Sequence, residues 1–122
     1  MRFAFWMVLV AGVLPYVTTG LAKSGGFDNR APRDWVNSLS GWRRRADWAH
    51  RNHFEAFAPF AASVFAATLN GRSHLAADVL SGTFIAARVG YTVAYVADQP
   101  ALRSVLWFIG LGCTLALFWL GA

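Results

Sequence analysis

The chain has 122 residues, of which 57% are hydrophobic and 14% are charged, and its formal net charge is +5. This length limits it to one domain, and the apolar content places it in the membrane class. So apolar a chain is not expected to bind nucleic acid, and we attribute its basic charge to membrane topology.

Four largely apolar segments are each about 20 residues long, the length of helix that crosses the hydrocarbon core of a bilayer. We therefore predict four membrane-spanning helices. They cover residues 3–22, 48–69, 75–97 and 102–121. We therefore expect an all-α, integral membrane four-helix bundle, a single domain over residues 1–122 with a long loop at residues 23–47. The first segment also resembles a secretory signal peptide, but its length and its Trp6, Pro15 and Tyr16 favour a retained helix.

Basic residues predict the orientation in the membrane. The long loop carries Lys23, Arg30, Arg33, Arg43, Arg44 and Arg45, whereas the opposite side offers only Arg2 and Arg72. By the positive-inside rule the loop is cytoplasmic, so both termini and the short connection 70–74 lie outside. The expectation is a multi-pass protein of a bacterial inner membrane, with its termini in the periplasm.

The cytoplasmic loop predicts a short helix at the membrane interface. Pro32 suits a first helical turn, and Trp35, Leu39 and Trp42 recur at an amphipathic spacing. Together with the run Arg43 to Arg45, these tryptophans are expected to anchor the segment among lipid headgroups.

Polar residues cluster where the second segment enters lipid. On a helix Arg51, Asn52 and Glu55 share one side, and charges at this depth are expensive and usually functional. The third segment carries one polar stripe, made of Arg88, Tyr91, Thr92 and Tyr95. Asp78 lies about 15 Å from Arg88 along that helix, so Glu55 is the better expected partner and Asp78 has no predicted role beyond a contact with another subunit.

Arg103 and Ser104 follow the turn into the fourth segment and reach the same membrane face. So many polar groups at one depth favour a small anionic ligand over a purely structural network. We expect no metal, because His50 and His53 have no evident third ligand, and no protein nucleophile is apparent.

These residues resemble a known family. The matching positions are His50, Arg51, Asn52, Glu55, Pro59, Arg88, Tyr91, Tyr95, Arg103 and Ser104. They are similar to the MAPEG superfamily, the membrane-associated proteins in eicosanoid and glutathione metabolism, here to a bacterial member of the microsomal glutathione transferase type.

The resemblance implies a homotrimer that binds glutathione, as co-substrate, between subunits near the cytoplasmic face. It implies that Arg103, helped by Ser104, donates to the glutathione sulfur and favours the thiolate. His50, Arg51, Asn52 and Glu55 then hold the tripeptide together with Arg88, Tyr91 and Tyr95. The implied function is a detoxifying glutathione transferase or peroxidase that acts on a hydrophobic electrophile taken from the lipid.

Three departures from the family pattern and two other function classes stay open. Trp48 stands where many members have an arginine, and Ala56 where some have a tyrosine. The end of the first helix offers only Lys23, where several eicosanoid enzymes carry arginines. These departures argue against a specific eicosanoid activity. The main alternative is a non-catalytic trimeric binding or scaffold protein for a lipid or an anionic thiol. A small transporter subunit is a weaker one, because the polar groups do not continue across the membrane.

Overall fold

The computed structural model describes residues 2–70 and 73–122, and all of the regular secondary structure in those residues is helical. Its elements are α1 (Phe3–Lys23), α2 (Pro32–Asn37), α3 (Gly41–Leu69), α4 (His74–Val96) and α5 (Pro100–Gly121). The predicted all-α bundle is therefore confirmed. Gly71 and Arg72, which belong to the predicted external connection, lie outside the described residues.

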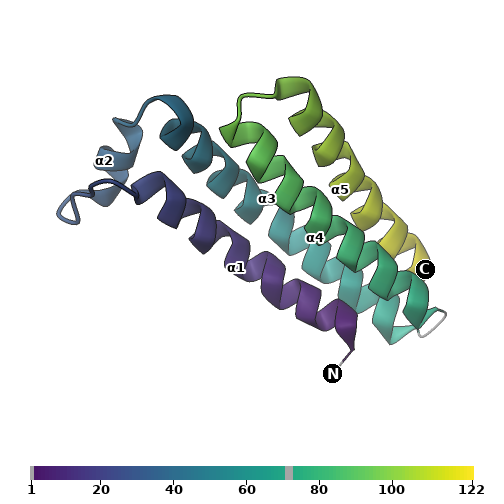
Figure 1. The fold of residues 1–122 in the computed structure, drawn as a ribbon. Coiled ribbons are helices and arrows are strands. Elements are labelled where there is room, and N and C mark those ends of the chain that lie inside the picture. Colours follow the sequence, from purple (N-terminus) through teal and green to yellow (C-terminus); the bar gives the residue numbers. More distant parts are fainter. Residues whose placement is uncertain (1, 71–72) are drawn as a thin grey trace.

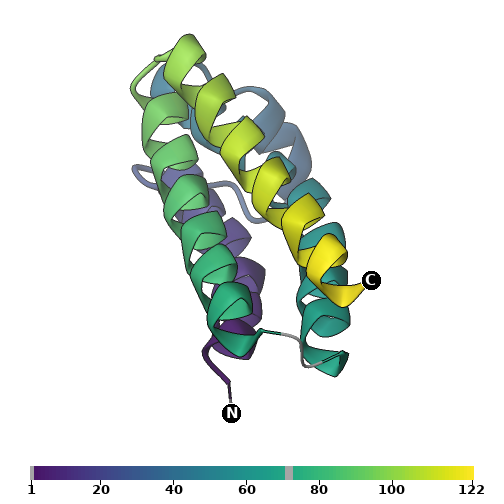
Figure 2. The same cartoon turned by 90° about the vertical axis from the view of Figure 1, so that its right-hand side faces the viewer.

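The four long helices pack side by side, and α2 lies at one end of them (Figures 1 and 2). Both chain termini lie at the opposite end, where α3 ends and α4 begins (Figure 1). The α4–α5 turn lies at the same end as α2. This arrangement brings the start of α3, the end of α4 and the start of α5 together, which is where the predicted polar residues gather.

Three of the described helices, α1, α4 and α5, are long and apolar enough to cross a membrane. These helices support the prediction of a membrane protein. Helix α3 is long enough to cross a membrane, but its first two turns are charged and its hydropathy is lower than that of the other three helices. A fourth span over residues 48–69 therefore stays a prediction. Helix α3 begins at Gly41, earlier than that segment.

Aromatic stacking joins α3 and α4 in the middle of the bundle. The rings of Phe60 and Phe84 are stacked with centroids 3.7 Å apart, and both side chains are buried. Small residues such as Ala11 and Ala67 surround this pair and allow the helices to approach closely. The pair lies next to the polar site and therefore fixes α3 against α4 there.

The turn between α4 and α5 has the geometry of a Schellman motif. The Asp98 backbone takes φ 58°, and the Gln99 and Asp98 amides donate to the carbonyl oxygens of Ala94 and Tyr95. Pro100 then opens α5. This tight reversal places Arg103 beside Tyr95, but it leaves the carbonyl of Val96 without a partner in its own helix.

The run of three arginines at the start of α3 supplies that partner and two others. Arg45 binds the Val96 oxygen at the end of α4, and Arg43 binds the Ala22 oxygen at the end of α1. Arg44 binds the carbonyl oxygens at the end of α2. Anchoring of this run among headgroups stays a prediction, and each guanidinium has a second role, because it caps the carboxyl end of a different helix.

The prediction of one amphipathic helix through Trp35, Leu39 and Trp42 was wrong. Helix α2 ends at Asn37, where the Ser38 hydroxyl donates to the Trp35 oxygen, and Trp42 belongs to α3. The break follows from local chemistry, because serine side chains compete for backbone groups and Gly41 takes a positive φ of 61°.

Asp78 has a role that the sequence did not reveal. Its carboxylate accepts a hydrogen bond of 2.9 Å from the Ala4 amide in the first turn of α1. An acidic group at a helix amino terminus accepts a hydrogen bond from a free amide, and its negative charge interacts favourably with the helix dipole. A residue 74 positions away in sequence thus caps α1, within the same chain.

Candidate functional site

A groove between α3 and α4 collects most of the predicted polar residues. It has a volume of about 450 Å³ and is lined by Trp48, Arg51, Asn52, Glu55, Tyr91 and Tyr95. The α3 residues fall at i, i+3, i+4 and i+7, so the helical period alone puts them on one face. Trp48 adds an aromatic wall, with its ring 6.2 Å from that of Tyr95.

Cations and phenol rings alternate along the edge of this groove. The guanidinium carbon of Arg103 lies 4.6 Å from the ring centroid of Tyr95, and that of Arg88 lies 4.2 Å from Tyr91. The two tyrosine rings meet edge to face with centroids 5.5 Å apart. A ring face attracts a cation, so both guanidiniums are held in place while they keep their charge.

Arg88 is the most deeply buried cation of the site, at 2% exposure. Its Nη2 donates to Asn52 Oδ1 at 2.9 Å, and its Nε and Nη2 both approach His53 Nδ1. Glu55, the predicted partner, instead accepts from Asn52 Nδ2 at 2.9 Å. The predicted contact of Arg88 with Glu55 was therefore wrong, because Asn52 lies between them and bonds to both.

An apolar cavity opens directly beside this polar network. It has a volume of about 160 Å³ and runs between α3, α4 and α5. Asn52, Glu55 and Arg88 line its polar part, and Phe84, Trp107 and Leu111 line the rest. Asn52 and Glu55 also line the groove, so a polar ligand in the groove and an apolar ligand in the cavity can lie next to each other.

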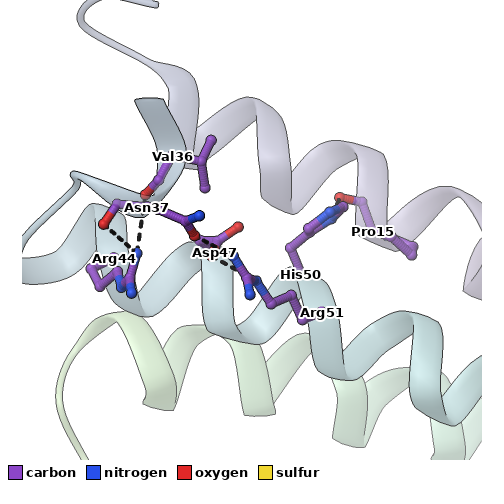
Figure 3. Close-up of polar contacts among 7 residues, drawn as sticks. All are labelled: Pro15, Val36, Asn37, Arg44, Asp47, His50 and Arg51. Carbon is purple, nitrogen blue, oxygen red and sulfur yellow. Dashed lines mark hydrogen bonds and ion pairs between the residues drawn. The ribbon is translucent and has the colours of Figure 1, made fainter. Parts of the chain in front are cut away.

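His50 and Arg51 face different surroundings, as Figure 3 shows. His50 points toward α1, where its Nδ1 donates to the Pro15 oxygen at 2.7 Å. Arg51 pairs with Asp47 at 2.9 Å and donates to the Asn37 side chain, yet it stays exposed. Within one subunit the fold therefore separates His50 from the groove, whereas Arg51 remains at its edge.

The structure thus brings most of the predicted site residues together. Those that line or border the groove are Arg51, Asn52, Glu55, Arg88, Tyr91, Tyr95 and Arg103. Ser104 is exposed at the start of α5. His53 was considered only as a metal ligand. The polar stripe on α4 contains Thr92, and His53 lies on the helix that packs against this stripe. That placement is the signal that could have indicated a buried hydrogen bond between His53 and Thr92.

Comparisons with known proteins place the chain in a family. The model of the MAPEG family matches residues 3–122, nearly the whole chain. No curated protein and no solved structure matches. The matched range includes the four long helices and every residue of the groove. The chain therefore belongs to the MAPEG family.

Proposed function

We propose that the protein is a glutathione-dependent membrane transferase. In this proposal the groove binds glutathione and activates its thiol for attack on a hydrophobic electrophile. Membership of the MAPEG family supports glutathione-related or eicosanoid-related membrane chemistry in general. The same activated thiol would also reduce a hydrophobic peroxide, and either reaction would serve detoxification.

The observation that carries the proposal is the position of Arg103 on the ring of Tyr95. A thiol with an ordinary pKa of about 8.5 is mostly protonated at neutral pH, and a neighbouring cation lowers that pKa. Arg103 makes no ion pair within the described residues, so its charge is free for a ligand. We propose that this charge stabilises the glutathione thiolate and that Ser104 adds a hydrogen bond.

The remaining groove residues fit the other groups of the tripeptide. Glutathione carries two carboxylates and one ammonium group. Arg51 and Arg88 offer guanidiniums, which bind carboxylates well, and Glu55 offers an exposed carboxylate for the ammonium group. Tyr91 and Tyr95 supply ring surfaces and hydroxyl groups.

The apolar cavity next to the groove is the proposed site of the second substrate. The thiolate sulfur would form a bond to an electrophilic carbon, and the leaving group would depart with its electron pair. Phe84, Trp107 and Leu111 provide an apolar surround that favours a hydrophobic molecule from the lipid. No metal is required for this reaction.

We further propose that the protein assembles as a homotrimer in a bacterial inner membrane, with the long loop in the cytoplasm. The groove is open on one side within a single subunit, so a neighbouring subunit would enclose the ligand. In this proposal a ligand at that interface would also contact His50, which faces α1 in its own subunit.

The test is ultraviolet difference absorbance of the purified protein in detergent, titrated with glutathione. We expect a saturable thiolate band in the wild type and its loss in Arg103→Ala, with both proteins eluting at the same size. Binding without a band would favour the non-catalytic binding protein. Absence of binding would mean that glutathione is not the ligand.

A further inference from the structure

Among the described residues, His53 and Arg88 form the buried hydrogen bonds that join two side chains, with exposures of 3% and 2%. We propose that His53 is a positioning residue, a neutral acceptor that fixes the Arg88 guanidinium without cancelling its charge. The groove then keeps a positive potential for an anionic thiol. This inference rests on the proposed glutathione-binding function.

The hydrogen bonds determine which nitrogen of His53 carries the proton. Arg88 Nε and Nη2 lie 3.2 and 3.0 Å from His53 Nδ1, and a guanidinium can only donate. Nδ1 must therefore be unprotonated. The proton sits on Nε2, which donates to Thr92 Oγ1 at 2.7 Å, and the Thr92 hydroxyl in turn donates to the Arg88 oxygen.

Hydrogen bonds also determine the orientation of the Asn52 side-chain amide, which lies next to this pair. Asn52 Oδ1 accepts from Arg88, so its Nδ2 is free to donate to Glu55. Hydrogen bonds are thus donated outward from Arg88 along two branches, one through Asn52 to the Glu55 carboxylate and one through His53 to the Thr92 hydroxyl. Orientation of His53 therefore determines the orientation of groups that line the groove.

The charge of Arg88 is not paired directly. Within residues 2–70 and 73–122 no carboxylate forms an ion pair with it, and Glu55 reaches it only through Asn52. A carboxylate in place of His53 could orient the guanidinium equally well, but it would neutralise the charge. The neutral imidazole ring orients the guanidinium and leaves its charge in place.

Other titratable groups act on this pair and on Tyr91 from three helices. Helix α3 contributes His50 and Glu55, α4 contributes Tyr91 and Tyr95, and α5 contributes Arg103. Helix α1 has no charged side chain over residues 4–22. Of these groups, all within the described part of the chain, Glu55 is the one carboxylate, so an added carboxylate would change the potential strongly.

Two nearly isosteric substitutions test the proposal. In both His53→Asn and His53→Asp an oxygen can occupy the region of Nδ1, and the two variants differ only in charge. With His53→Asn we expect the midpoint pH of the thiolate titration to stay close to that of the wild type. With His53→Asp we expect it to rise by about one pH unit, since the new carboxylate pairs with Arg88.

Equal midpoints for the two variants would overturn the proposal, because the charge at position 53 would then not reach the ligand. A second measurement uses the unsubstituted protein, so it does not depend on the variants folding. The nitrogen NMR shifts of labelled histidine report tautomer and charge. We expect a neutral ring protonated on Nε2 for His53 from about pH 5 to 8.

An Nδ1-protonated or cationic ring would also overturn the proposal. Failure of the proposed function has a different signature, namely no glutathione binding by the wild type. In that case the nitrogen shifts decide the inference alone, because they are recorded without ligand. The assignment of the His53 resonance comes from the spectrum of His53→Asn.

Discussion

The Arg45 guanidinium closes the carboxyl end of α4 by donating from Nε and Nη2 to the Val96 oxygen, at 3.2 and 3.0 Å. The Schellman turn leaves this carbonyl without a helical partner, so the arginine satisfies a group that would otherwise need water. The contact holds α3 to α4 at the end of the bundle where Tyr95 meets Arg103. A basic run from which the topology is predicted thus also supports the site.

Arg45→Ala should lower stability. The substitution removes two charge-assisted hydrogen bonds to a helix end, and we expect a loss of about 2 kcal/mol. The midpoint of thermal unfolding in detergent should fall by several degrees. Arg30→Ala is the matched control, because Arg30 lies in the connection between α1 and α2 and its side chain makes no hydrogen bond with the described residues. Similar midpoints for the two variants would contradict the capping role.

Asp78→Ala should loosen the start of α1. The Ala4 amide loses its acceptor, and caps of this kind are worth about 0.5–2 kcal/mol. Hydrogen exchange of the amides in the first turn of α1 should accelerate, while exchange in the middle of α3 should not change. Asp78→Asn retains an acceptor and should show a smaller effect. Unchanged exchange in Asp78→Ala would show that the cap contributes nothing.

Tyr95 should act on the thiol through the position of Arg103. Tyr95→Phe keeps the ring under the guanidinium, so the thiolate band should persist. Tyr95→Ala removes a contact worth about 0.5–1 kcal/mol, and the fraction of thiolate should fall about two- to fivefold. Difference absorbance at fixed pH measures both variants. A larger loss in Tyr95→Phe than in Tyr95→Ala would assign the effect to the hydroxyl group instead.

Ala56→Phe should reduce turnover of the hydrophobic substrate without changing the binding of glutathione. Ala56 lines the apolar cavity of about 160 Å³, which a phenyl group would largely fill. We expect the glutathione thiolate to form normally, while turnover of chlorodinitrobenzene falls at least tenfold. Ala62→Phe is the control, because Ala62 is exposed on the same helix and does not line that cavity. Equal activity of the two variants would place the electrophile elsewhere.

Periodicity explains how much of the site could be predicted. Arg51, Asn52 and Glu55 share one face of a helix at any tertiary arrangement, and so do Arg88, Tyr91 and Tyr95. The pairing between these two faces could not be predicted, because it depends on how α3 and α4 are rotated against each other. His53 and not Glu55 meets Arg88 for this reason.

The sequence by itself determined the helical class, the apolar character of the long helices and the residue types available to a ligand. These follow from apolar content and spacing, which act within one segment. Only the tertiary structure decided that Asp78 caps α1, that the three arginines cap three different helices and that Arg103 lies on Tyr95. Each of these contacts joins groups from two different helices. Side-chain packing and the demand of free backbone groups for partners select them once the helices meet.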